Sequence, residues 1–285
     1  MLTYTSRTPT EADTERILEL FFGAYPTMAF EKAKENIKSR LLNSKSFICQ
    51  DGEKIVGHIS QRQSQTEGDL CFLLVDPDYR KLGIGRQLMH NSTAEFEDTE
   101  KLVHGYPVTQ HSHSQRICLR EGYSPTKLEL IIERDLGAGQ RESFVHFARL
   151  YRRKTAFSAY LPAQHHEIAS YILTPFCDLE IQQNLETISE EMQNALIKEL
   201  QLRLESDVFS ISLTSPFAPF GIIYLKTHGF YCAGFSPQID KEGNLTFVAN
   251  MGKIPQQEIA KGKIQVIPEV RPLFDFVWQQ YENKG

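Results

Sequence analysis

The chain has 285 residues, enough for two domains of ordinary size, and its 41% of hydrophobic residues excludes a wholly disordered protein. A net charge of -5 provides no basic field for a nucleic acid, so we expect no nucleic-acid partner. No apolar run is long enough to cross a bilayer, and residues 1–7 lack the features of a leader segment, so we expect a cytoplasmic protein without a membrane partner.

Short predicted strands and helices make up the first seventy-five residues. A strand-like stretch at 2–6 precedes a helical pattern that starts near Thr10 and ends before Pro26, and a second helical stretch covers 30–42. The pair Asp51-Gly52 is a hairpin signal between strands at 46–50 and 54–63. The apolar run 70–75 ends at Asp76-Pro77 and predicts a buried strand. The five cysteines are scattered, with no Cys-x-x-Cys pair, and are expected to be reduced.

The loop after the apolar strand carries two glycines, Gly83 and Gly85, and a helical pattern follows it. Glycines allow positive φ and close backbone approach, and the first turn of a helix offers unpaired N–H groups. The loop therefore predicts a cradle for a phosphate or pyrophosphate, against the simpler interpretation of an ordinary glycine turn. A P-loop and a dinucleotide loop are excluded, because the chain has here neither Gly-Lys-Ser/Thr nor a third glycine.

The stretch from Val75 to Gly85 resembles the acyl-CoA loop of the GNAT acyltransferase superfamily. Its pattern is Arg or Gln, two residues, Gly, one residue, then Gly or Ala, and Arg80, Gly83 and Gly85 match it. The order of the preceding elements also matches. The resemblance implies an α+β fold of the α/β sandwich type, with a mixed, mainly antiparallel central sheet flanked by helices. It also implies acetyl-CoA or another acyl-CoA as cosubstrate.

The resemblance also implies which residues contact the cosubstrate. The backbone of the apolar strand would pair with the pantetheine arm, and the glycine loop would hold the pyrophosphate. The expected cofactor-binding residues are Leu74, Val75, Arg80, Lys81, Leu82, Gly83, Ile84, Gly85, Arg86 and Ser114.

Residues 111–123, after a strand expected at 102–108, resemble the family's later motif, with Gly122-Tyr123 in place of Gly-Phe. His111 stands where an Asn is common. Cys118 stands where many members have the Tyr that protonates the departing CoA sulfur. The usual general acid is therefore missing from this chain.

Five residues are candidates for the catalytic roles: Asp69, Glu67, His111, Cys118 and Tyr123. The two carboxylates, or His111, would act as general base, and Cys118, Tyr123 or the nearby Tyr106 as proton donor. Each has a simpler alternative, because loop carboxylates are commonly solvated and a Cys or Tyr on an apolar face is usually core. His104, His111 and His113 lack ligands at a supporting spacing, so we expect no metal site.

We expect two domains, residues 1–137 and 140–285, with a linker near 137–139. Segments 102–132 and 207–250 share the order strand, helix, Gly-aromatic pair, strand, and the two pairs are 107 residues apart. Residues 151–207 contain no Gly-x-Gly, so the second domain is expected to be a degenerate GNAT-like unit that ends in a helix at 270–281. The alternative is an unrelated α+β domain.

Together these features predict an N-acyltransferase, in the first place an N-acetyltransferase, that acts on an amine of a small molecule or peptide by direct attack on acetyl-CoA. The acceptor cleft is expected between the two halves, in a monomer or homodimer. The alternative is a non-catalytic sensor or scaffold that binds CoA or acyl-CoA, which the absent tyrosine favours. A hydrolase is disfavoured because the chain has no Gly-x-Ser-x-Gly elbow.

Overall fold

A computed structural model describes residues 1–24, 30–132, 142–182, 189–255 and 259–283. The linker expected at 137–139 lies outside these ranges. The strands are β1 Leu2–Arg7, β2 Lys45–Asp51, β3 Lys54–Gln63, β4 Glu67–Val75, β5 Leu102–Gly105, β6 Ser124–Ile132, β7 Glu142–Leu150, β8 Thr155–Tyr160, β9 Cys177–Gln182, β10 Val208–Ser212, β11 Phe230–Ile239 and β12 Leu245–Lys253. The helices are α1 Glu11–Ala24, α2 Phe30–Leu42, α3 Ile84–Ala94, α4 His113–Arg120, α5 His166–Leu173, α6 Glu190–Gln201, α7 Ala218–Thr227 and α8 Arg271–Glu282.

A ten-stranded sheet runs through both halves in the order β1-β2-β3-β4-β5-β7-β6-β11-β12-β10. Its neighbouring strands are antiparallel except for β4 and β5, which are parallel. β8 and β9 form a separate parallel pair. The mixed, mainly antiparallel sheet flanked by helices confirms the predicted fold class. In the described ranges no helix has both the length and the apolar character that crossing a bilayer requires.

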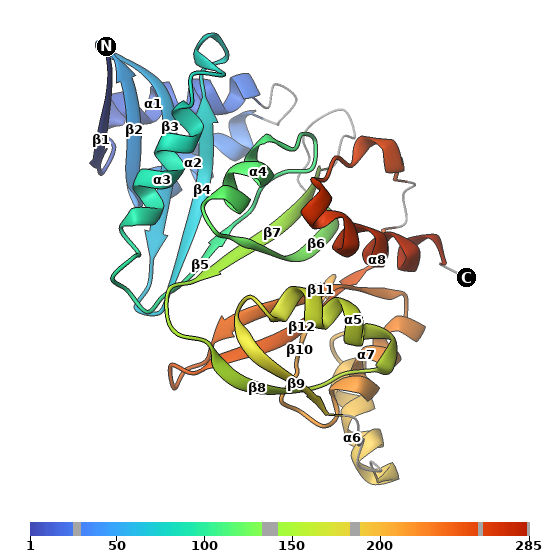
Figure 1. Cartoon of the computed structure of the whole chain (residues 1–285). Coiled ribbons are helices and arrows are strands. Elements are labelled where there is room, and N and C mark those ends of the chain that lie inside the picture. Colours follow the sequence, from blue (N-terminus) through green and yellow to red (C-terminus); the bar gives the residue numbers. More distant parts are fainter. Residues whose placement is uncertain (25–29, 133–141, 183–188, 256–258, 284–285) are drawn as a thin grey trace.

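Helices cover the first half of the sheet on two faces (Figure 1). α1 and α2 lie behind β1–β4 and bury Ile17, Phe21 and Leu41 against strand residues that include Leu74. α3 lies in front, where Leu88 joins the larger core of the molecule. The apolar positions that the helical spacing predicted are thus the buried faces of these helices.

The parallel pairing of β4 and β5 ends at Leu70 and Gly105, earlier than the strand predicted at 102–108. Beyond this point β4 continues to Val75, paired on its other side with β3. At Phe72 the β4 backbone has φ +55°, an uncommon conformation for a large residue, and the register with β3 shifts there. The two strands therefore diverge next to a bulge, and a gap opens in the sheet.

A buried histidine holds this bulge. His58 on β3 is 0% exposed and contacts the Phe72 carbonyl oxygen at 3.1 Å and the Ser46 hydroxyl at 2.9 Å. Burial lowers the pKa of His58 to about 4. The folded protein therefore keeps this imidazole neutral at pH values where the unfolded chain already protonates it.

This histidine makes stability depend on pH. Because the folded pKa lies below the unfolded value of about 6.5, the free energy of unfolding falls as pH drops from 6.5 to 4, by about 3 kcal/mol at most. Urea unfolding at pH 7 and pH 4.5 measures this loss. His58→Gln is expected to be less stable at pH 7 and to show a smaller loss between the two pH values. An unchanged pH slope in that variant would contradict the assignment.

The second half repeats the strand order of the first. β5, α4, β6 and β7 give the order β5-β7-β6, and β10, α7, β11 and β12 give the corresponding order β10-β12-β11. Gly122 and Gly229 both have φ near +80°, at +80° and +81°. Register shifts occur at corresponding positions, between Pro125 and Lys127 on β6 and between Cys232 and Gly234 on β11. Lys127 and Gly234 are also the pair that joins β6 to β11.

β7 follows the boundary expected at 137–140, yet it pairs with both β5 and β6. The strand assigned to the start of the second domain thus completes the sheet of the first. We propose that the second unit begins after β7, near residue 151, and that it is a degenerate copy of the first unit's β5–β7 region. The matching strand order and register shifts support this proposal.

Candidate functional site

A cavity of about 370 Å³ occupies the gap where β4 and β5 diverge. Phe21 and Arg40 line it from the α1 and α2 face, and Met89 and Cys118 line it from the α3 and α4 face. The cavity therefore connects the two faces of the sheet. All of its described lining residues lie between 21 and 146, and only Phe144 and His146 of β7 come from beyond the boundary expected at 137–140.

The glycine loop lies between β4 and α3. Gly83 precedes the first residue of α3 with φ +80°, and a Cβ built there would meet no atom within 4 Å. Lys81 also has positive φ, at +68°. Arg80, Lys81, Leu82 and Arg86 are exposed. The loop thus presents the unpaired N–H groups of the first turn of α3, with basic side chains around them, to open space.

Close packing sets the position of the α3 N-terminus. Ile84 is 1% exposed, and a Cβ on Gly57 of β3 would lie only 2.6 Å from its Cγ2 atom. Gly57 therefore lets the first turn of α3 approach the sheet.

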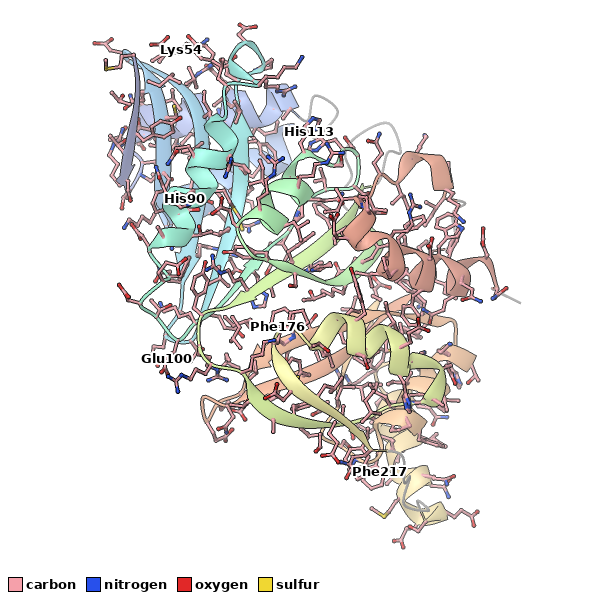
Figure 2. The ribbon with its side chains drawn as sticks, viewed as in Figure 1. Lys54, His90, Glu100, His113, Phe176 and Phe217 are labelled. Carbon is pink, nitrogen blue, oxygen red and sulfur yellow. The ribbon has the colours of Figure 1, made fainter. Side chains whose placement is uncertain are left out.

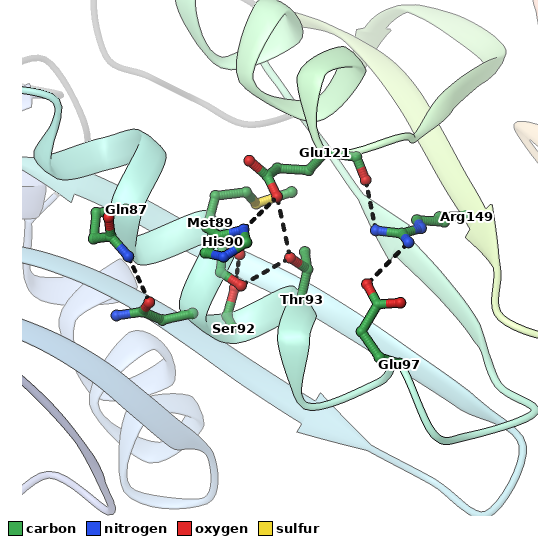
Figure 3. Close-up of polar contacts among 9 residues, drawn as sticks. Gln87, Met89, His90, Ser92, Thr93, Glu97, Glu121 and Arg149 are labelled. Carbon is green, nitrogen blue, oxygen red and sulfur yellow. Dashed lines mark hydrogen bonds and ion pairs between the residues drawn. The ribbon is translucent and has the colours of Figure 1, made fainter.

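A polar network joins α3 to the end of α4 (Figure 3). The Glu121 carboxylate contacts His90 Nδ1 at 3.2 Å and accepts from the Thr93 hydroxyl at 3.4 Å. Arg149 of β7 donates to the Glu121 carbonyl at 2.8 Å and to the Glu97 carboxylate at 2.9 Å. This network fixes α3, which follows the glycine loop, relative to α4, which carries Cys118.

The β4 backbone next to the cavity is open on its β5 side. Leu74 and Val75 pair with His58 and Gly57 of β3, whereas the described pairing with β5 stops at Leu70. A strand edge with free N–H and C=O groups can pair with an extended ligand that carries amide groups. Leu74 and Val75 therefore have the free strand edge that the expected pairing with a pantetheine arm would require.

Ser114 and Cys118 line the cavity from α4. The Ser114 hydroxyl is buried and has no hydrogen-bond partner among the described residues, so it is available to a bound ligand. Burial raises the pKa of Cys118 to about 12. Because an ordinary thiol has a pKa near 8.5, a proton transfer from Cys118 to a departing thiolate would be uphill, which disfavours Cys118 as the general acid.

The two carboxylates predicted as general base are engaged elsewhere. Asp69 lies within β4 and accepts from the Tyr106 hydroxyl at 2.7 Å and from Arg62 at 3.2 Å. Glu67, at the start of β4, accepts from the backbone N–H of Ile239 at 3.2 Å. Neither lines the cavity. Asp69 instead positions Tyr106, and Glu67 ties the first half to β11.

The remaining candidates differ in whether they line the cavity. His111 lines the cavity, and its pKa is lowered first by desolvation and then by His113 and Arg80. Tyr106 also lines the cavity, and its pKa is raised by burial and by Asp69. Tyr123 is 1% exposed and does not line the cavity. Its prediction as a proton donor is therefore disfavoured, and it fills the core instead.

Sequence reasoning missed a histidine that lines the cavity. His146 of β7 lines the cavity, and its ring packs edge-on against Tyr106 with 4.7 Å between centroids. Its Nε2 lies 3.2 Å from the Glu129 carboxylate, which also forms an ion pair with Lys127. Burial lowers the pKa of His146, and Glu129 offsets this only in part. The structure thus brings a neutral imidazole, backed by a carboxylate, to the cavity.

The second half supports the site through a buried glutamine. Gln115 of α4 is 0% exposed; its amide nitrogen donates to the Gln265 carbonyl at 2.8 Å, and its oxygen accepts from the Ile267 N–H at 3.2 Å. The Gln265 N–H donates to the Thr109 carbonyl at 2.8 Å. Residues 265–267 therefore hold the loop and helix that carry His111 and Ser114.

Replacement of this glutamine is expected to cost stability. Gln115→Leu leaves the buried Ile267 N–H and the Gln265 carbonyl without their partner, so the free energy of unfolding should fall by about 3 kcal/mol. Urea unfolding measures the loss. The control is Gln87→Leu, which changes an exposed helical glutamine whose side chain donates to Asn91 (Figure 3). Equal small effects of the two variants would show that Gln115 does not hold the halves together.

The three histidines that the sequence singled out lie in two separate places. His111 and His113 have ring centroids 5.5 Å apart, and His113 lies at the start of α4 (Figure 2). His104 packs instead beside Tyr106. Within the described ranges, no three His, Cys, Asp or Glu side chains are placed to hold a metal ion.

Comparison with known proteins gives one family match: residues 19–133 match the model of an acetyltransferase (GNAT) domain. No curated protein sequence matches the chain significantly. Three similar structures cover about half of this chain. They are the ribosomal-protein-S18-alanine N-acetyltransferase of Escherichia coli (16% identity, 53% of this chain and 96% of that one, TM-score 0.44), the ribosomal-protein-alanine N-acetyltransferase of Brucella melitensis (15%, 51% and 99%, 0.42) and an acetyltransferase of Streptococcus agalactiae (14%, 52% and 98%, 0.41).

Proposed function

Because residues 19–133 of this chain are an acetyltransferase domain of the GNAT family, we propose that it transfers the acetyl group of acetyl-CoA to the amine of a small molecule or peptide. The cavity through the gap between β4 and β5 carries this proposal. It joins the face that bears the glycine loop to the opposite face, so a thioester and an amine can meet from two sides.

The cosubstrate would bind along α3 and β4. The N–H groups of the first α3 turn, after Gly83, would hold the pyrophosphate, and Arg80, Lys81 and Arg86 would add charge. The open edge at Leu74 and Val75 would pair with the amides of the pantetheine arm and place the thioester in the gap.

The acceptor would enter from the α1 and α2 side. There the imidazole of His146 takes the proton that the amine must lose, and Glu129 stabilises the resulting charge. The amine nitrogen attacks the thioester carbonyl carbon, a C–N bond forms, and the C–S bond breaks. His146 replaces Asp69 and Glu67 in the role of general base, because it lines the cavity and they do not.

The leaving thiolate needs a donor other than the family's tyrosine. The Ser114 hydroxyl, which has no partner among the described residues, would donate a hydrogen bond to the sulfur, and the proton would come from solvent. Ser114 thus stabilises the thiolate without losing its own proton. This role also explains why a buried hydroxyl stands without a partner at this position.

One observation favours the alternative of a sensor that binds acyl-CoA without transfer. Cys118 stands at the tyrosine position, and burial raises its pKa to about 12, so this thiol is a poor acid for the reaction. The sensor would keep the glycine loop and lack turnover.

Calorimetric titration with acetyl-CoA, followed by thiol release with a panel of amines, separates these possibilities. Binding with amine-dependent thiol release supports the transferase. Binding without release from any amine favours the sensor. The absence of binding would overturn both.

A further inference from the structure

We propose that the acceptor carries a carboxylate or phosphate group, which Arg40 of α2 binds on the acceptor side of the cavity. This inference rests on the proposed acyl transfer, and it adds the chemical class of the acceptor.

The charges around the cavity point to an anionic ligand. Arg40 and Arg62 both line it, whereas none of its described lining residues is an Asp or Glu. The chain as a whole has a net charge of -5, so this local positive charge runs against the average of the molecule. A simple ammonium compound would find no lining carboxylate to pair with, while an amine with an acidic group would find a complementary charge.

The two arginines differ in their partners. Arg62 forms an ion pair with Asp69 at 3.2 Å, so its charge is largely compensated. Arg40 has no carboxylate partner in the described part of the chain. Its guanidinium contacts the Cys71 sulfur at 3.9 Å and stacks over the Phe72 ring at 5.0 Å. These contacts leave the other N–H donors of the planar Arg40 guanidinium available to a carboxylate or phosphate.

The backbone at Phe72 supports this placement. Cys71 and Phe72 are consecutive residues of β4, and Arg40 contacts both of them. Consecutive side chains of a regular strand point to opposite faces, and the bulge with φ +55° at Phe72 removes that alternation. The Phe72 ring thus supports the flat side of the Arg40 guanidinium at the cavity wall.

Turnover with matched amines tests the acceptor class. Each set contains small primary amines that carry a carboxylate, a phosphate or a neutral amide, for example glycine, phosphoethanolamine and glycinamide. The wild-type protein should favour an acidic member over the amide by about tenfold to a hundredfold in kcat/KM, the span expected for charge-assisted hydrogen bonds. The preferred acidic member identifies the source of the anion. Equal use of the amide would overturn the inference while leaving the transferase intact.

The variant Arg40→Gln should lose that preference through a higher KM, with unchanged acetyl-CoA affinity, and Arg40→Lys should restore part of it. The control is Arg203→Gln, which removes an arginine that stacks on Phe209 at 5.2 Å and does not line the cavity. A uniform loss for acidic and neutral acceptors in Arg40→Gln would contradict anion recognition.

Direct binding decides the question even without turnover. N-acetylglycine, N-acetylglycinamide and inorganic phosphate are titrated into the wild-type protein and Arg40→Gln by calorimetry. Binding of N-acetylglycine or phosphate, but not of the amide, that is lost in Arg40→Gln supports the anion site whether or not acetyl-CoA binds. If neither anion binds, or if Arg40→Gln binds them equally, the inference is overturned. Failure of acetyl-CoA to bind counts against the proposed function alone.

Discussion

Gly83→Val is expected to weaken acetyl-CoA binding by about 100-fold or more, because a β-branched residue strongly disfavours positive φ and the first turn of α3 would have to rearrange. Gly83 has φ +80° immediately before that turn. The N–H groups of the loop are useful only if they converge on one phosphate position. Calorimetry with acetyl-CoA measures the loss.

The control for this prediction is Gly243→Val. Gly243 has φ +84°, and a Cβ there would also meet nothing within 4 Å, but it lies in the turn between β11 and β12. The two substitutions impose similar backbone strain, so they should reduce the melting temperature to a similar extent. Acetyl-CoA affinity retained by Gly83→Val would refute the loop assignment. Affinity lost in both variants would indicate general unfolding.

His146→Gln is expected to reduce kcat by about 100-fold, the lower end of the range for a general base, with little change in acetyl-CoA affinity. The wild-type rate should fall on the acidic side of the pH profile, because only the neutral imidazole accepts a proton. Since burial lowers the pKa of His146, this fall is expected below the ordinary histidine value of about 6.5. The variant should lose this acidic limb.

His104→Gln is the matched control for the base. His104 packs beside Tyr106 as His146 does, but it does not line the cavity, so its replacement should largely preserve kcat and keep the acidic limb of the pH profile. If His104→Gln and His146→Gln reduce kcat equally and keep the acidic limb, the base lies elsewhere. His111, which also lines the cavity, would then be the next residue to test.

Local signals in the sequence predicted the first half of the fold closely. The helical spacing of Ile17, Leu20 and Phe21, and the turn at Asp51-Gly52, depend on neighbours in the chain, and the structure has α1 and the β2–β3 hairpin there. The glycine loop was visible for the same reason, because Gly83 and Gly85 are close together in sequence. The bulge at Phe72 was not predictable, since it depends on His58, which reaches it across the sheet.

The polar side of the site depends on long-range pairing. Lys127 and Glu129 alternate with apolar residues on β6, a pattern that predicts one polar face, but their contact with His146 arises from the register of β6 and β7. That pairing was obscured because we expected a domain boundary before β7. Asp69 and Glu67 looked available in the sequence, and only the fold reveals their partners Tyr106 and Ile239.

The most direct test of acyl transfer in this cavity is product analysis by mass spectrometry after incubation with acetyl-CoA and a primary amine that carries a carboxylate. We predict an N-acetylated amine in an amount equal to the CoA released, with formation slowed in His146→Gln and abolished in Gly83→Val. Release of CoA together with free acetate, and without acylated amine, would indicate hydrolysis. That result, or the absence of any acylated product across carboxylate, phosphate and neutral amines, would contradict the transferase.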